Sequence, residues 1–311
     1  MDRRNFLKSG VATAAATAVL ADLSTMPARA DEAKTDGAAG GGGSEVVAVR
    51  NGSAVAMFRK GIEALGGMTA FVKPGQKVVV KPNIGWDRTP EQAANTNPEL
   101  VAEIVRQAIA AGAAQVQVFD HTCNEWKSCY RNSGIEAAVV AAGGKMLSAH
   151  DEKLHYVEKS CPQAVSLKTA KIHQAIIDAD VFINVPVLKH HGGAKMTAAM
   201  KNFLGIFWDR SFMHKNNLPQ CIADCALYRR PDLNVVDAYR IVVANGPRGK
   251  VAEDIRELRY QLLSRDIVAI DAMATKVIGY ELADVPYIAL AATAGLGVAD
   301  FSRITVKRLE A

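Results

Sequence analysis

Cysteine is scarce in this sequence of 311 residues. The five cysteines are odd in number, and none stands in the closely spaced Cys-x-x-Cys-x-x-Cys pattern of ferredoxin-type clusters. A disulfide framework requires a small, cysteine-dense domain, so a disulfide-stapled fold is excluded, although one bridge is allowed. Two alternatives stay open: packed thiols, or a metal or cluster held by cysteines from two segments. The cysteines are Cys123, Cys129, Cys161, Cys221 and Cys225.

The sequence also lacks an apolar run long enough to span a membrane. The apolar-leaning stretch from Gly10 to Leu23 has fourteen residues. A transmembrane helix needs about 20 residues to cross the hydrocarbon core, and no later segment reaches that length. We therefore expect no stable membrane insertion of the mature chain.

The sequence also lacks a large excess of charge of either sign. The formal net charge is +5, and residues 1–30 hold four of the 37 cations and two of the 32 carboxylates, which leaves +3 for the remainder. So small an excess does not support binding to nucleic acid or to a membrane surface. Any functional positive charge must therefore be local.

The N-terminus has the three parts of a removable export signal. Arg3 and Arg4 give a basic start, the Gly10–Leu23 stretch follows, and Ala28-Arg29-Ala30 is a small-x-small cleavage site. The paired arginines before Phe-Leu-Lys resemble a twin-arginine signal, although Asp2 stands where Ser or Thr is usual; an ordinary secretory signal is the alternative. The resemblance implies export by the twin-arginine translocase after folding, to a periplasmic or otherwise exported location.

Residues 1–30 are thus assigned to the signal peptide, and residues 31–44 to a flexible linker that contains Gly40-Gly41-Gly42-Gly43-Ser44. Residues 45–311 remain for a single α/β domain, near the upper end of the usual domain size. At 49% hydrophobic residues, the chain can bury a full core.

Short β-rich runs alternate with helical patterns along this domain, which predicts a mostly parallel sheet with helices on both faces. One helix start is clearly marked. Asn97 can cap the helix, Pro98 suits the first helical position, and the negative charge of Glu99 suits the positive end of the helix dipole. The predicted strands are Glu45–Val49, Lys77–Lys81, Gln115–Asp120, Lys145–Ser148, Val181–Val187, Asn234–Asp237, Ile267–Asp271 and Arg303–Lys307. The predicted helices are Ala54–Leu65, Pro98–Ala111, Gly134–Ala142, Ala170–Ala179, Lys195–Phe203, Pro219–Tyr228, Ala269–Ile278 and Val285–Ala294, with strand and helix both open over Ile267–Ile278.

Several predicted strands end abruptly in polar residues. Ligands of a parallel α/β sheet bind beyond the carboxyl ends of its strands, so these endings predict a cleft of cations, imidazoles and carboxylates. Taken alone, Lys81-Pro82-Asn83 is equally compatible with a turn, and Asp120 with a cap. The endings are Lys81-Pro82-Asn83, Asp120-His121, Lys189-His190-His191-Gly192-Gly193 and Asp237.

The paired histidines before paired glycines are the most suggestive ending. The glycines let the backbone approach a ligand closely, and a helix beginning near Ala194 would direct free N–H groups at an anion. Arg248 is either a substrate clamp or part of a tight turn. The predicted groups for an anionic ligand are Lys81, Asn83, Lys189, Lys195, Lys201 and Arg248, with His190, His191 and Asp120 as catalytic candidates. A weaker metal hypothesis involves His214, His121, Cys123 and Cys129, whose spacing matches no standard zinc signature.

Blocks along nearly all of the domain resemble the domain of unknown function 362 family. That resemblance implies an α/β domain but no settled reaction. Some relatives are described as iron–sulfur proteins with a ferredoxin-like segment, which this sequence lacks. The blocks are Val80–Asn83, Asn95–Leu100, Asn184–His191, Met200–Gly205, His214 and Asn245–Gly249.

A fainter similarity links the order His-His-Gly-Gly-Ala-Lys and a later histidine to the nickel-pincer lactate racemase group. It implies that Lys195 bears the cofactor, that His190 or His191 exchanges a proton, and that His214 ligates nickel. The proline expected after the lysine is absent, and the spacing to His214 differs. The cofactor is therefore unassigned, with a metal ion, an iron–sulfur cluster and a nickel-pincer nucleotide as the candidates.

Two classes of function remain after these observations. One is an exported enzyme, metal- or cofactor-dependent, in which lysines hold a small anionic substrate while a histidine moves protons or binds metal. The other is a non-catalytic binding protein that captures an anionic ligand or a redox or metal cofactor in the same cleft.

Overall fold

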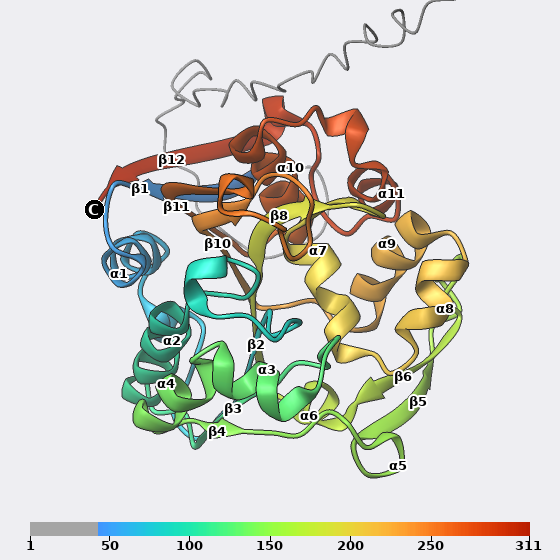
Figure 1. Ribbon diagram of the computed structural model, residues 1–311, viewed down its shortest axis with the longest axis horizontal. Helices are drawn as coiled ribbons and strands as arrows, with labels where there is room; N and C mark the ends of the chain where they lie inside the picture. The colour runs from blue at the N-terminus through green and yellow to red at the C-terminus, as the bar shows by residue number, and fades with distance from the viewer. Residues whose placement is uncertain (1–42) are drawn as a thin grey trace, which may run out of the picture.

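The computed structural model describes residues 43–311, and the signal peptide and nearly all of the expected linker lie outside them (Figure 1). The first strand begins at Ser44, one residue before the predicted start of the domain. The strands are β1 (Ser44–Arg50), β2 (Lys77–Pro82), β3 (Gln115–Val118), β4 (Lys145–Met146), β5 (Tyr156–Ser160), β6 (Thr169–His173), β7 (Val181–Val185), β8 (Val187–His191), β9 (Lys195–Thr197), β10 (Leu233–Val242), β11 (Ile255–Ser264) and β12 (Ile304–Glu310). The helices are α1 (Ala54–Ala64), α2 (Pro98–Ala110), α3 (Trp126–Asn132), α4 (Ile135–Ala141), α5 (Glu152–His155), α6 (Gln174–Asp178), α7 (Ala199–Asn202), α8 (Arg210–Lys215), α9 (Leu218–Tyr228), α10 (Ile267–Ile278) and α11 (Pro286–Thr293).

Ten of these strands form one large sheet in the order β12-β1-β11-β10-β7-β2-β3-β4, and β8 joins β10 and β9 beside this path. The pairs from β10 through β7, β2 and β3 to β4 are parallel, whereas β11 runs antiparallel to both β1 and β10. Strands β5 and β6 form a separate antiparallel hairpin. The predicted mostly parallel sheet is therefore confirmed.

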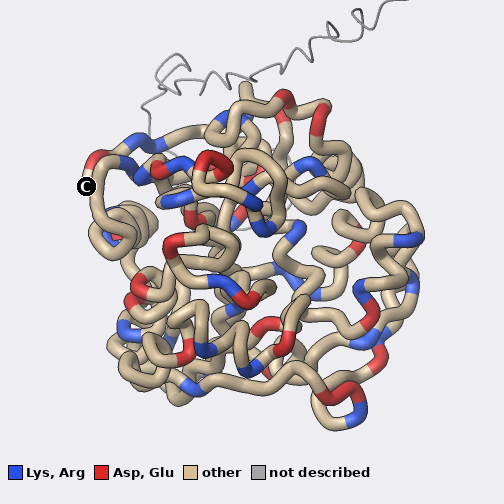
Figure 2. The backbone as a smooth tube through the Cα atoms, in the orientation of Figure 1, with Lys and Arg blue, Asp and Glu red and all other residues tan. Residues whose placement is uncertain are grey.

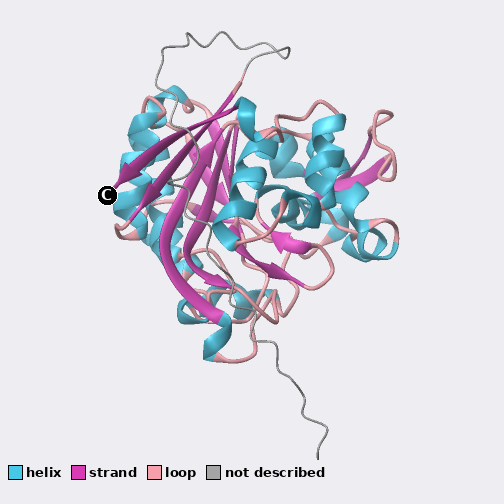
Figure 3. Ribbon diagram, turned by 90° about the horizontal axis from the view of Figure 1, so that it is seen from above, coloured by secondary structure: helices cyan, strands magenta, loops and turns pink. Residues whose placement is uncertain are grey.

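Helices cover both faces of the sheet, as the view from above shows (Figure 3). The alternation of side chains along β1 divides the core in two, because Val46 and Ala48 pack into one cluster and Val47 and Val49 into the other. Helices α1, α2 and α4 contribute to the second cluster, and α7, α9, α10 and α11 to the first. The predicted two-sided packing is confirmed.

The helix start at Asn97 is also confirmed. The Asn97 side chain accepts hydrogen bonds from Glu99 N at 2.9 Å and from Leu100 N at 3.4 Å, and Pro98 occupies the first helical position. Among the residues that the structure describes, no helix has the length and apolar character to cross a bilayer. Figure 2 shows cationic and anionic residues interspersed over the backbone.

Four expected elements differ from the structure. Ile267–Asp271 is helical, because Asp266 caps α10 by accepting from Val268 N and Ala269 N. The expected strand Val181–Val187 divides at Pro186, which has no N–H group to donate. The two other differences are expected helices that begin as strands, β6 within Ala170–Ala179 and β9 within Lys195–Phe203.

The short helix α7 matters because it carries Lys201 and Asn202. Its first N–H groups are bound by Asp271 of α10, whose oxygens accept from Ala199 N at 2.6 Å and Met200 N at 3.0 Å. Asp271 is fully buried, and burial raises the pKa of its carboxyl to about 7. The prediction of a helix near Ala194 that offers free N–H groups to a ligand was therefore wrong.

We expect Asp271→Ala to destabilise the fold by about 1–3 kcal/mol, because two buried donors lose their acceptor. The measurement is urea unfolding of the mature chain. The matched control is Asp151→Ala, which removes an exposed carboxylate cap from the four-residue helix α5 and should cost about 0.5 kcal/mol. Equal losses for the two variants would contradict the role given to Asp271.

Candidate functional site

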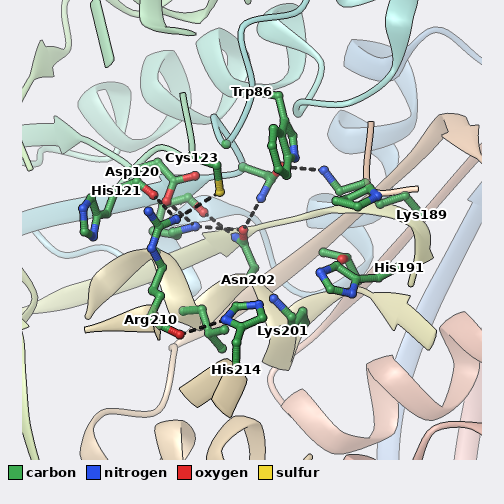
Figure 4. A pocket seen from close by; sticks show the side chains of 17 residues that line it. Trp86, Asp120, His121, Cys123, Lys189, His191, Lys201, Asn202, Arg210 and His214 are labelled. Atoms are coloured by element: carbon green, nitrogen blue, oxygen red, sulfur yellow. Dashed lines mark hydrogen bonds and ion pairs between the residues drawn. The ribbon is translucent and has the colours of Figure 1, made fainter. Parts of the chain in front are cut away.

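A cavity of about 280 Å³ lies where strands β2, β3 and β8 end (Figure 4). Side chains from these ends meet others from α7 and α8 and from the loop that follows β2. The lining residues are Lys81, Asn83, Gly85, Trp86, Asp120, His121, Cys123, Lys189, His191, Thr197, Lys201, Asn202, Leu204, Gly205, Arg210, His214 and Pro247. The cavity thus occupies the position where a parallel sheet is expected to bind a ligand.

At the base of the cavity, Lys81 and Asp120 form a buried ion pair. Lys81 Nζ lies 2.8 Å from Asp120 Oδ1, and the two residues are only 1% and 2% exposed. The other carboxylate oxygen accepts from Ile84 N at 2.7 Å. Gly205 makes this approach possible, because a Cβ there would stand 1.8 Å from Asp120 Oδ1 and 2.6 Å from Lys81 Nζ.

Buried amide side chains hold this pair in place. Asn202 Oδ1 accepts from Lys81 Nζ at 2.8 Å and from Asn83 Nδ2 at 3.2 Å. Asn202 Nδ2 donates to Asn184 Oδ1 at 2.9 Å, and Asn184 donates in turn to Asn234 Oδ1 at 3.0 Å. The chain of amides therefore connects α7 to strands β2, β7 and β10 beneath the cavity.

The cavity carries more positive than negative charge. Its lining has three lysines and Arg210 but a single carboxylate, Asp120. Lys189 Nζ donates to Asn83 Oδ1 at 2.8 Å and to the carbonyl of Ala94, both neutral acceptors. Burial lowers the pKa of Lys189 to about 7 and that of Lys201 to about 8.

His191 presents a hydrogen-bond donor to the cavity. Its Nδ1 atom accepts from Gly193 N and from Ala194 N, both at 3.0 Å, so the proton of the neutral ring stands on Nε2. Burial and the neighbouring Lys201 and Lys189 lower the pKa of His191 to about 3. The ring therefore stays neutral and offers an N–H group.

His214 has the opposite arrangement. Its Nδ1 atom lies 2.8 Å from the carbonyl oxygen of Arg210, to which it donates, so Nε2 keeps its lone pair. Desolvation and Lys201 lower the pKa of His214, while the hydrogen bond to Arg210 opposes them. The rings of His191 and His214 are 6.3 Å apart. The cavity thus has a donor and a proton acceptor on two neighbouring imidazoles.

Arg210 and the segment after Asp120 close another side of the cavity. The Arg210 guanidinium donates to the carbonyls of His121 at 2.8 Å and Thr122 at 2.6 Å, and to Cys123 Sγ at 3.2 Å. The His121 ring donates from Nδ1 to the carbonyl of Phe207 and stacks on Trp208 with centroids 4.9 Å apart. Burial lowers the pKa of His121 to about 4.

Four of the sequence-predicted site residues do not line the cavity. His190 accepts from Gly246 N at 3.0 Å and thus contacts the Asn245–Gly249 block. Lys195 is exposed, with Nζ 4.7 Å from the ring centroid of Tyr280. Arg248 lies over Trp86 at the edge of the cavity, 5.1 Å from its ring centroid, and Cys129 is fully buried.

Sequence reasoning also missed several lining residues. The pattern of strand endings does not mark Trp86, Thr197 or Arg210, and Asn202 and Gly205 appear only within a family block. No strand ending identifies Arg210 or Asn202, because both stand on short helices that tertiary contacts bring to the sheet. The free cysteines that the structure describes include four buried thiols, consistent with packing.

The donor set gives limited support to a metal or cofactor. Within residues 43–311, no group of three or more His, Cys, Asp or Glu side chains is arranged to hold a metal ion. His214 already donates to a backbone carbonyl, and Cys123 accepts from Arg210. The residues assigned to a nickel-pincer nucleotide do not share one cavity either, because Lys195 lies outside it. No step is therefore assigned to a bound group.

Comparisons with known proteins give two matching sequence models, one similar protein and one similar solved structure. The model described as "Domain of unknown function (DUF362)" matches residues 78–276, and the model for a twin-arginine translocation pathway signal sequence matches residues 1–19. A thylakoid-associated protein of Synechocystis sp. is 26% identical over 260 residues, which cover 79% of this chain and 76% of that protein.

Among solved structures, the lactate racemase apoprotein from Thermoanaerobacterium thermosaccharolyticum matches with a TM-score of 0.43 and 13% identity. The match covers 69% of this chain and 53% of that chain, so this chain spans about half the length of the racemase.

We expect Gly205→Ala to destabilise the protein by about 3 kcal/mol or more, because the added methyl group forces the buried ion pair apart. Urea unfolding of the mature chain measures this loss. Gly192→Ala is the matched control, since a Cβ at Gly192 would meet only Gly246 O at 3.9 Å, and it should change stability by less than about 0.5 kcal/mol. A Gly205 variant as stable as the control would show that the pair tolerates displacement.

Proposed function

This chain is an exported member of the DUF362 family, and on that premise we propose that it is an enzyme that binds a small anionic substrate and moves a proton on it. The cavity between β2, β3, β8, α7 and α8 is the proposed active site. The family description names no reaction, so the proposal rests on the arrangement of the cavity residues.

The observation that carries the proposal is the pair of histidines with opposite hydrogen-bonding capacity. His191 keeps Nδ1 occupied by two backbone N–H groups and offers Nε2–H, whereas His214 donates from Nδ1 and keeps a lone pair on Nε2. One imidazole can polarise an oxygen of the substrate while the other accepts a proton from it. Simple capture of an anion requires donors only, so the acceptor on His214 favours an enzyme.

Charge supports an anionic substrate. Asp120 is paired with Lys81, which leaves Lys189, Lys201 and Arg210 without a carboxylate partner in the lining. Their positive charge in a desolvated site attracts an anion more strongly than it would in water. Because the pKa values of Lys189 and Lys201 are lowered to about 7 and 8, we expect a bound anion to raise both.

His214→Gln should therefore lower proton transfer while leaving anion binding in place. The probes are pyruvate, malonate and phosphonoacetate, which are small anions with an exchangeable C–H group. Deuterium incorporation from D₂O, followed by NMR, measures proton transfer, and calorimetry measures binding. We expect the exchange rate of a bound probe to fall about 10²–10⁴-fold, the usual contribution of a general base.

The matched control is His155→Gln, which changes a histidine that stacks on His173 outside the cavity. It should retain both binding and exchange. If wild-type protein binds a probe and exchanges none of its protons, the binding-protein function replaces the enzyme. If none of the three anions binds, the proposed anionic substrate class is wrong.

A further inference from the structure

The three buried lysines of the cavity differ in what their ammonium groups contact. Lys81 Nζ pairs with Asp120 and donates to Asn202. Lys189 Nζ donates to Asn83 and to the carbonyl of Ala94. These two lysines are held by their acceptors and contribute charge and structure.

Lys201 is different. It is only 8% exposed and lines the cavity, and within residues 43–311 its Nζ atom has neither a hydrogen bond nor an ion pair. The side chain extends from α7 into the cavity, between His191 and His214 (Figure 4). An ammonium group that reaches a desolvated cavity without an acceptor from the protein is costly, so this position calls for a ligand or for a neutral amine.

Thr197 is a second, independent observation at the same place. Thr197 is 3% exposed and lines the cavity, and its Oγ1 atom has no hydrogen-bond partner among the described residues. Buried hydroxyl groups are normally paired. Two unsatisfied polar groups, one nitrogen and one oxygen, thus line one cavity together with both imidazoles.

We propose that Lys201 is a nucleophile that forms a Schiff base with a small 2-oxo acid. This inference rests on the proposed function of the same cavity and names its substrate class. The carboxylate of such an acid matches the uncompensated charge of Lys189 and Arg210, and its carbonyl oxygen matches the N–H group of His191. Thr197 supplies a further hydrogen bond to the adduct.

The surroundings increase the fraction of Lys201 that is the neutral amine. The pKa of Lys201 is lowered to about 8, mainly by burial and in part by Arg210 and Lys81, against the opposing effects of Cys123 and Cys225. Desolvation and neighbouring cations are the means by which a lysine becomes nucleophilic near neutral pH. The same cations hold the carboxylate of the substrate.

The bond changes balance without an oxidant or a reductant. The amine nitrogen of Lys201 bonds to the carbonyl carbon, and the π electron pair moves to the oxygen, which the N–H group of His191 stabilises. His214 accepts one proton from the nitrogen and passes it to the alkoxide oxygen, which gives the neutral carbinolamine. It then carries the second proton of the nitrogen to the hydroxyl group. The C–O bond then breaks, water leaves, and the C=N bond remains.

Borohydride trapping tests the proposal. Mature protein is incubated with pyruvate, reduced with sodium borohydride, and examined by intact mass and peptide mapping. We expect one reduced pyruvate adduct, located on Lys201. Because the neutral amine reacts, trapping should increase as the pH rises from 6.5 through about 8.

Two variants accompany the experiment. Lys201→Arg keeps a cation but has no nucleophilic amine, so it should lose the adduct and still bind pyruvate by calorimetry. Lys195→Arg changes an exposed lysine over Tyr280 and should keep the adduct in full.

An adduct on another lysine, or pyruvate bound to wild-type protein without an adduct, would overturn the role of Lys201. Absence of pyruvate binding would overturn the 2-oxo acid as substrate class. In each of these cases the proposed function is tested separately, by the binding and proton exchange of malonate and phosphonoacetate. Neither of these probes has a ketone, so neither can form the adduct.

Discussion

The buried ion pair of Lys81 and Asp120 is the constraint on which the rest of the site depends. Two charges at 1% and 2% exposure are tolerated only with close geometry and further hydrogen bonds, which Ile84 N and Asn202 provide. This requirement explains the glycine at position 205, since any side chain there would enter the pair. It also explains why α7 must lie against the end of β2, although only four residues form that helix.

The same pair determines the electrostatics of the cavity. Asp120 compensates Lys81 and leaves the other cations of the lining without a carboxylate. Their mutual repulsion, added to desolvation, lowers the pKa of Lys189, Lys201 and His191 together. This excess of positive charge is the basis on which an anionic ligand is proposed for the cavity.

Much of this architecture could be predicted from the sequence, because hydrophobic runs and capping residues act locally. The parallel sheet, the cap at Asn97 and the meeting of Lys81, Asp120, Lys189 and His191 follow from strands that end at one edge. The strand β11 was missed because exposed charges at its start, such as Arg256 and Glu257, obscure its pattern. The positions of Asn202 and Arg210 in the site could not be predicted from strand endings for another reason. Tertiary contacts bring both residues to the cavity, and no local pattern marks them.

The adjacent residues His190 and His191 have different environments in the structure, although the sequence alone does not distinguish them. Side chains alternate along a strand, so Lys189 and His191 of β8 face the cavity while His190 faces the opposite way. There His190 accepts from Gly246 N, and a Cβ at Gly246 would lie 1.9 Å from the His190 carbonyl oxygen. The neighbouring Pro247 lines the cavity, and Arg248 covers Trp86 at its edge. His190 therefore contacts the loop that borders the cavity, whereas His191 lines the cavity itself.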